Sequence, residues 1–244
     1  MRRAVTLITA PTLALLAAAC SQADASSSPS RAGNVPDALH PVVLELYQSQ
    51  GCSSCPPANA NLNALAGRPE ILALSFPVTY WDYLGWKDRF ARPEFAQRQR
   101  DFASTGRSDG VYTPQFVING RSALVGRDRN VLNRAISAAG PAHGAPAIAI
   151  NDKAIILGAG SKGSLAKILL VTYDPHERLV PIRAGENNGR TLPHRNIVTE
   201  LRSLGQWTGA ARRIALPPPG DAALARAVLL QQGEGGPILA ARRI

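Results

Sequence analysis

The apolar and polar positions in the first part of the chain predict a strand, a helix and a second strand. An apolar run over residues 42–47 predicts the first strand, and residues 55–66 predict the helix. Residues 71–78 are apolar almost without interruption, which is typical of a strand covered on both faces. Because a helix connects the two strands, we expect a βαβ unit.

Two further helices and a hairpin are predicted before residue 140. Residues 93–102 predict a helix that opens on a proline and places two phenylalanines on one face. A strand follows Pro114 and ends at the Asn-Gly turn 119–120, which suits a two-residue hairpin to residues 122–125. Residues 128–139 predict a last helix, whose first residue is an aspartate suited to cap it.

The pattern changes after a linker at residues 140–145 that is rich in Gly, Pro and Ala. Short apolar runs separated by turn residues then continue to the end of the chain, which is typical of an antiparallel sheet. We therefore expect an α/β domain at residues 41–140, with a mixed sheet flanked by helices, and a separate small all-β sandwich at residues 146–244. Within the second part, Gly185–Thr191 is the most polar segment. A structured turn is its first interpretation, and a binding edge is the alternative.

The N-terminal segment predicts export. Arg2 and Arg3 precede an uncharged run to Ala19, which has the charge pattern and length of a signal peptide over residues 1–19. The sequence before Cys20 also approximates a lipoprotein processing site, so lipidation of Cys20 and ordinary cleavage are both open. Residues 20–40 would then be a flexible tether, and the protein would lie in the periplasm or envelope, with or without a lipid anchor in the membrane.

The chain is basic, with a formal net charge of +10, which becomes +8 without Arg2 and Arg3. Such a charge raises the question of nucleic-acid binding. The basic residues are scattered, however, and no known nucleic-acid motif accompanies them, so we expect no nucleic-acid partner. A solvated basic surface near anionic envelope components is the preferred interpretation.

Cys52 and Cys55 form a C-x-x-C pair between the first strand and the first helix. A thiolate at Cys52 would be stabilised by the free N–H groups and the dipole of a helix that begins at or just after it. Cys55 would then resolve a mixed disulfide. A structural disulfide is one alternative, although such a short loop restrains little. A zinc site is another, but it needs more ligands than the spacing provides.

A second motif supports the redox interpretation. Thr113-Pro114 opens an apolar strand and is similar to the cis-proline loop of thioredoxin folds. Together, SQGCSSCPPA, YWDYLGWKD, RQR and VYTPQFVING resemble an exported bacterial family with a thioredoxin-like domain that is catalogued as a domain of unknown function. The resemblance covers about residues 40–244 and implies a thioredoxin-like fold for the first domain. A histidine and an aspartate are usual in the family where this chain has Pro77 and Thr79, which weakens any transfer of metal binding.

Three other side chains are candidates for the site. Glu45 lies on the first strand seven residues before Cys52 and could shuttle protons, with exposure at a sheet edge as the preferred alternative. Trp81 and Trp86 belong to an aromatic insertion. They could form a substrate-binding wall beside Cys52, or a hydrophobic cluster that only anchors the insertion.

These observations predict an exported thiol-disulfide oxidoreductase without cofactor or metal, whose partners are protein disulfides or thiols of the envelope. Cys52 would attack, Cys55 would resolve, and the backbone at Thr113 and Pro114 would pair with an extended substrate. A non-catalytic binding or scaffold protein with a closed disulfide is the main alternative. Copper delivery, with His143 or His194 brought to the sulfurs by the fold, is a further one.

Overall fold

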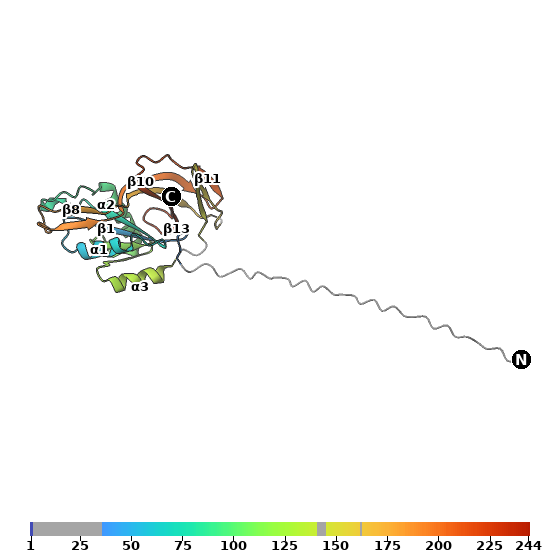
Figure 1. The fold of residues 1–244 in the computed structure, drawn as a ribbon, viewed down its shortest axis with the longest axis horizontal. Coiled ribbons are helices and arrows are strands. Elements are labelled where there is room, and N and C mark those ends of the chain that lie inside the picture. The colour runs from blue at the N-terminus through green and yellow to red at the C-terminus, as the bar shows by residue number, and fades with distance from the viewer. Residues whose placement is uncertain (2–35, 141–144, 162) are drawn as a thin grey trace. The chain divides into compact units, whose positions relative to one another are not determined.

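The computed structural model describes Met1 and residues 36–140, 145–161 and 163–244 (Figure 1). The predicted signal peptide after Met1, Cys20, the tether up to residue 35 and His143 lie outside the described residues. No helix within the described part of the chain is long and apolar enough to span a membrane.

The first half forms the expected βαβ unit, followed by two helices and a hairpin. In chain order, its elements are β1 (Val42–Gln48), α1 (Pro56–Leu65), β2 (Ile71–Pro77), the 3-10 helix η1 (Asp82–Leu84), α2 (Pro93–Phe102), the π-helical turn η2 (Ala103–Arg107), β3 (Gln115–Ile118), β4 (Ser122–Leu124) and α3 (Arg129–Ala139). Strands β1 and β2 are parallel, and β3 is antiparallel to β1. The Asp128 side chain caps α3 by accepting the N–H groups of Asn130 and Val131, as the sequence predicts.

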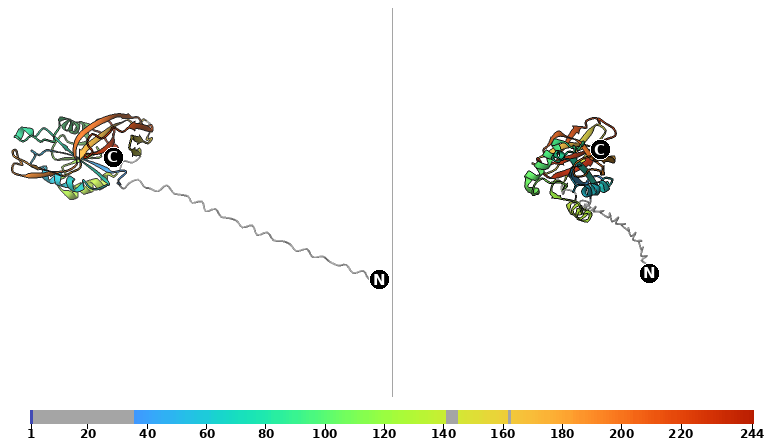
Figure 2. Two further views of the ribbon diagram at one scale, coloured as in Figure 1. Left: turned by 45° about the horizontal axis from the view of Figure 1, so that its top comes forward. Right: turned by 90° about the vertical axis from the view of Figure 1, so that its left-hand side faces the viewer.

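Helices cover both faces of these strands, which explains why every residue of β1 and β2 is buried. Leu44 and Leu46 pack against α1 and α3 in one core cluster. Val43 and Tyr47, on the other face, pack against Phe95 of α2. Figures 1 and 2 show α1 and α3 together on one side of the sheet and α2 on the other.

The second half consists of strands. They are β5 (Ile148–Asn151), β6 (Ala154–Leu157), β7 (Ala166–Asp174), β8 (Arg178–Pro181), β9 (Thr191–His194), β10 (Ile197–Trp207), β11 (Arg212–Ala215), β12 (Ala225–Gln231) and β13 (Ile238–Arg243). Four of them extend the first sheet, in the order β13-β12-β7-β10-β2-β1-β3-β4. A three-stranded sheet of β11, β6 and β5 packs on β7 and β12, and β8 pairs with β9 alone.

Residues 146–244, as far as the structure describes them, do not form the separate sandwich domain that we expected. Two sheets do pack face to face there, but the described residues from 36 to 244 form one compact unit with a continuous mixed sheet. Strand β10 joins β2 in parallel, where Ile197 is the partner of Ser75. The alternation of apolar residues predicts strands but does not reveal which edge they pair with, and so the sequence did not exclude the continuous sheet.

Asn196, just before β10, joins the second half to β2 through two hydrogen bonds. Its carbonyl accepts the N–H of Ser75 at 2.9 Å, and its side-chain amide donates to the carbonyl of Ala73 at 2.8 Å. The residue is buried and has a positive φ of 50°. Asparagine tolerates this left-handed conformation better than most residues with a side chain.

We expect Asn196→Ala to lower the free energy of unfolding by about 2–3 kcal/mol, because it leaves the Ala73 carbonyl unpaired and puts an alanine at positive φ. Asn196→Gly is the control, since glycine accepts this φ without strain, and it should cost about 1–2 kcal/mol. Urea unfolding measures both values. Equal losses in the two variants would show that backbone conformation has no part in the effect.

Candidate functional site

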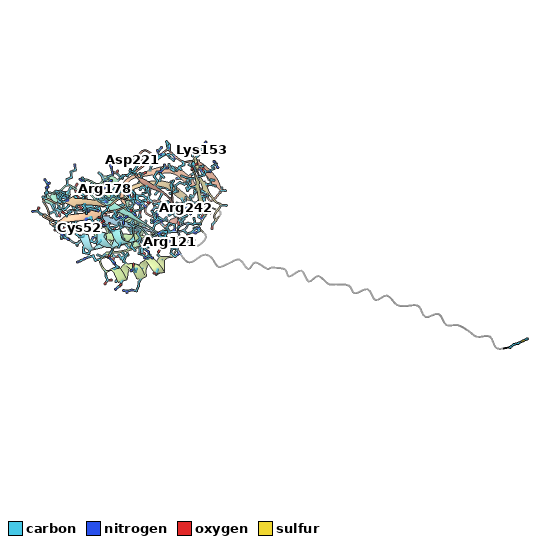
Figure 3. All side chains as sticks on the ribbon, viewed as in Figure 1. Cys52, Arg121, Lys153, Arg178, Asp221 and Arg242 are labelled. Atoms are coloured by element: carbon cyan, nitrogen blue, oxygen red, sulfur yellow. A yellow bond between two sulfur atoms is a disulfide. The ribbon has the colours of Figure 1, made fainter. Side chains whose placement is uncertain are left out.

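The C-x-x-C motif lies in the turn between β1 and α1, and its two sulfurs form a disulfide. Figure 3 labels Cys52 beside the start of α1. Cys52 is 0% exposed and Cys55 is 1% exposed. The Sγ atom of Cys52 lies 3.2 Å from the hydroxyl of Ser54. The pair is thus closed and shielded from solvent.

Helix α1 agrees with the predicted helix over residues 55–66 to within one residue at each end. Its first two residues are Pro56 and Pro57, and Cys55 is the residue that precedes the helix. The N–H of Cys55 donates to the carbonyl of Cys52 at 3.2 Å. Because proline has no N–H, two of the donors that normally point out of a helix start are missing. A thiolate at Cys52 would therefore receive less stabilisation than we expected.

The Thr113-Pro114 loop lies next to the cysteine turn. The Thr113–Pro114 peptide bond is cis, as predicted. The hydroxyl of Ser54 donates to the carbonyl of Thr113 at 3.4 Å. Behind the loop, the buried side chain of Gln99 donates to the carbonyl of Tyr112 and to the side chain of Gln115. The two motifs are about 60 residues apart in sequence, and the fold brings them together.

The indole of Trp81 connects the same two loops. Its Nε1 donates to the hydroxyl of Thr113 at 2.7 Å. Its Cβ lies next to Gly51, where a side-chain carbon on the glycine would come within 3.4 Å. Trp81 is half-buried against the core. It is therefore placed beside the motif, as the substrate-wall interpretation requires, and contact with a substrate stays a prediction.

Trp86 and Asp88 hold the residue before the motif. The Nε1 of Trp86 donates to the side chain of Gln50 at 2.9 Å, and the carboxylate of Asp88 accepts the N–H of Gln50 at 2.9 Å. Trp86 also packs with Phe90 on a small cluster of residues from the second half. Burial raises the pKa of Asp88 to about 6. The aromatic insertion thus orders the cysteine turn, and Asp88 is a site residue that the sequence analysis missed.

The polar segment after β8 contributes two more residues that the sequence analysis missed. The carboxylate of Glu186 accepts the N–H of Ser53 at 2.9 Å. The amide of Asn187 donates to the carbonyls of Gln50 and Cys52, both at 2.9 Å. The segment is a turn, as expected, but it also contacts the motif directly. Its high density of polar residues was the only signal in the sequence.

Strand β9 binds α1 on the other side of the turn. The carbonyl of Pro193 accepts the side-chain amides of Asn59 and Asn63 at 2.5 and 2.9 Å. The next residue, His194, is buried and packs edge-on against Phe90. Burial, together with the nearby positive charge of Arg89, lowers the pKa of His194 to about 4. Within the described residues, no group of three or more His, Cys, Asp or Glu side chains is arranged to hold a metal ion.

Glu45 does not lie at a sheet edge, which corrects the preferred expectation. Strand β1 is an inner strand, and the Glu45 carboxylate is buried in an ion pair with Arg98 at 2.7 Å. Arg98 also donates to Gln231 of β12 at 2.8 Å. Side chains alternate along a strand, and Glu45 shares its face with Val43 and Tyr47, opposite the face that packs on α1. The proton-shuttle role therefore has no structural support.

The chain is a mixed α/β protein with a large mixed sheet and a disulfide-bonded C-x-x-C turn. It belongs to the family described as "Protein of unknown function (DUF1223)", whose model matches residues 43–231. A search of curated proteins returned no match.

Two solved structures are similar to this chain. A crystal structure of a protein from Agrobacterium tumefaciens, determined as a structural genomics target, has a TM-score of 0.70 and 29% identity. The alignment covers 83% of this chain and 93% of that one. HBP35 of Porphyromonas gingivalis has a TM-score of 0.50 and 12% identity, with coverage of 87% and 76%, so it shows a likeness of fold alone.

We expect Glu45→Ala to lower the free energy of unfolding by about 3–5 kcal/mol, because it leaves the buried guanidinium of Arg98 without its counter-charge. Glu45→Gln keeps a hydrogen-bond acceptor and should cost less. Urea unfolding measures the stabilities. The pH profile of Cys52 alkylation in the reduced Glu45→Gln variant should match the wild type, and a displaced profile would restore a proton-transfer role for Glu45.

We expect Asp88 and His194 to change stability with pH in opposite directions. The raised pKa of Asp88 means that the folded protein holds this proton more tightly than the unfolded chain. Its contribution is complete below about pH 4 and is lost as pH rises through about 6. The lowered pKa of His194 has the opposite effect, so its contribution grows between about pH 4 and 6.5.

Urea unfolding at several pH values tests this expectation. Relative to the wild type, His194→Gln should lose up to about 3 kcal/mol of stability as pH rises from 4 to 6.5, and Asp88→Asn should gain a similar amount over the same range. Differences from the wild type that do not vary with pH would contradict the assignment of either group.

Proposed function

We propose that this protein is an exported thiol-disulfide oxidoreductase that acts on protein disulfides or thiols through Cys52 and Cys55. The observation that carries the proposal is the disulfide-bonded C-x-x-C turn at the start of α1, within hydrogen-bond distance of the Thr113-Pro114 loop. Such a reaction needs a sulfur that attacks and a surface that holds the partner. We assign the first role to the cysteine turn and the second to the Thr113-Pro114 loop.

A thioredoxin-like interpretation of the first half belongs to the same proposal. The order β2-β1-β3-β4, with β3 antiparallel to β1, is consistent with such a domain, as are α1 and α3 on one face and α2 on the other. In this interpretation, the strands of the second half are an addition to the β2 edge of the domain.

The chemistry is disulfide exchange, which needs no cofactor. In the oxidised protein, a partner thiolate attacks the Sγ of Cys52, and Cys55 leaves as a thiolate. A second thiolate of the same partner then attacks the partner sulfur of the mixed disulfide, and Cys52 leaves as a thiolate. The partner leaves as a disulfide, and its two electrons remain on Cys52 and Cys55, which take up two protons. The reverse sequence reduces a partner disulfide and closes the pair again.

Partner binding would use the Thr113 loop and the indole beside it. An extended segment can pair with the backbone at Thr113 and Pro114 by strand addition. Trp81 offers an apolar surface with a polar end, and its bond to Thr113 places this surface at the junction of the two loops. The signal-like N-terminal segment supports an oxidising compartment, where such a pair works.

One observation favours the alternative of a non-catalytic binding or scaffold protein. Both sulfurs are buried, and residues from the second half cover the turn, as a permanent disulfide would allow. In that case the pair would only stiffen the turn before α1.

We expect Cys52 to react with iodoacetamide at neutral pH after mild reduction, with a pH midpoint below the usual value of about 8.5 for a free cysteine. The full chain should carry Cys20→Ser, so that only the pair reacts. In this background, Cys55→Ala should trap a protein partner that carries a disulfide, because the Cys52 thiolate attacks that disulfide and no Cys55 remains to resolve the mixed disulfide. Mass spectrometry measures both results.

Cys52→Ala is the matched control, because it keeps one cysteine in the same turn but removes the proposed attacking sulfur. It should trap far less partner than Cys55→Ala. If Cys52 stays unalkylated in the reduced protein and neither variant traps a partner, the scaffold alternative is correct.

A further inference from the structure

The burial of the cysteine pair conflicts with its proposed chemistry. A partner sulfur must approach the disulfide in line with the S–S bond, but Cys52 and Cys55 are at most 1% exposed. Part of the cover over the turn comes from residues more than 130 positions later in the chain. The proposed reaction therefore requires that some of this cover moves.

Asn187 makes the most specific contact with the turn. The side chain is fully buried, and its amide nitrogen donates to two carbonyls, those of Gln50 and Cys52. Its amide oxygen accepts a hydrogen bond from Arg190 at 2.8 Å. All three bonds agree with a single orientation of the amide. The side chain fits this place because it has two donors on one side and an acceptor on the other.

Glu186 closes the turn from the solvent side. Its carboxylate accepts the N–H of Ser53, the residue after Cys52, and this contact lowers the pKa of Glu186. The side chain is exposed, so the bond is in contact with water and can break at small cost. Asn187 and Glu186 together thus bind three backbone groups of residues 50–53.

Glu186 and Asn187 lie in the turn between β8 and β9, a hairpin that is attached to the rest of the fold by side chains. Within the part of the chain that the structure describes, strands β8 and β9 pair only with each other and do not join either of the other sheets. They are attached by a small apolar cluster under Trp86 and Phe90, by buried His194 against Phe90, and by the ion pair of Arg178 with Asp174. The side chains of Asn59 and Asn63 on α1 also donate to the carbonyl of Pro193 in β9. A unit with few strand contacts can open locally without unfolding the whole protein.

We propose that Asn187 and Glu186 form a latch that holds the β8–β9 hairpin closed over the C-x-x-C turn, and that a protein partner displaces it. This inference rests on the proposed function. Opening the latch frees two carbonyls and one N–H on residues 50–53. An extended polypeptide presents backbone groups of the same kind, so the partner can replace the latch at the site that it uncovers. Asn187 and Glu186 are positioning residues in this scheme.

The test measures how fast the Cys52–Cys55 disulfide is reduced by dithiothreitol in the folded full chain with Cys20→Ser. Dithiothreitol becomes a cyclic disulfide and passes two electrons and two protons to the cysteine sulfurs. Asn187→Asp has nearly the same shape, but it replaces the NH2 group, which donates both hydrogen bonds, with a carboxylate oxygen that faces the carbonyls of Gln50 and Cys52. We expect it to speed reduction about tenfold or more, and Asn187→Ala somewhat less, because buried hydrogen bonds are lost.

Conservative variants separate a latch from a general loss of structure. Glu186→Ala should speed reduction about threefold, whereas Glu186→Gln keeps an acceptor for the Ser53 N–H and should stay within about twofold of the wild type. Asn188→Asp is the matched control for Asn187→Asp, because Asn188 is exposed in the same turn. It should reduce at the wild-type rate. Each variant is compared at a temperature at which it is fully folded.

The variants should also lower the KM for a protein disulfide more than they change kcat, because they remove a competitor for the binding site. If Asn187→Asp and Glu186→Ala are reduced at the rate of the wild type and of Asn188→Asp, the latch is overturned. The trapping result for Cys55→Ala decides the oxidoreductase separately, because it depends on Cys52 and not on how fast the hairpin opens.

Discussion

The structure depends on one constraint, which is that the buried turn between β1 and α1 must find partners for its polar groups inside the protein. The polar residues Gln48, Ser49 and Gln50 are at most 1% exposed. A buried N–H or carbonyl group without a partner costs free energy. Asp88 binds the N–H of Gln50, Trp86 binds its side chain, and Asn187 binds its carbonyl. Two segments distant in sequence, the aromatic insertion and the turn between β8 and β9, are therefore tied to the turn that carries the cysteines.

The same requirement explains why the second half is part of one fold and not a separate domain. Arg98, buried on α2, satisfies its charge with Glu45 of β1 and also binds Gln231 of β12. Asn196 joins β10 to β2 through the backbone and its side chain. The bond between Arg98 and Gln231 and the bonds of Asn196 to β2 would be lost if the halves separated, so the polar contacts and the continuous sheet reinforce each other.

Local patterns in the sequence were sufficient for most of the elements, although not for β9, and for the capping aspartate of α3 and the meeting of the two motifs. The meeting was predictable because Thr113-Pro114 and the cysteine turn each belong to a recognisable local pattern. The contact between Asn187 and Gln50 was not predictable, since it spans 137 residues and depends on pairing that local patterns do not encode. Glu45 shows a different limit. A shift of one residue in register moves a side chain to the other face of its strand, and nothing in the local pattern favours the α2 face for Glu45.

The start of α1 bears on the direction in which electrons would flow. Strongly oxidising C-x-x-C proteins owe their potential to a stabilised thiolate in the reduced state. Here Pro56 and Pro57 lack the N–H groups that other residues would provide at the start of α1. The carboxylate of Glu186 accepts the N–H of Ser53, the residue after Cys52. Both features reduce the stabilisation that a thiolate receives in the closed protein and so favour the disulfide. In the proposed open state, the carboxylate has moved away and the prolines remain. The open protein should therefore hold its thiolate better than the closed one, but less well than a helix start with all its donors. This order favours a couple that gives electrons to its partner over one that works as a strong oxidant.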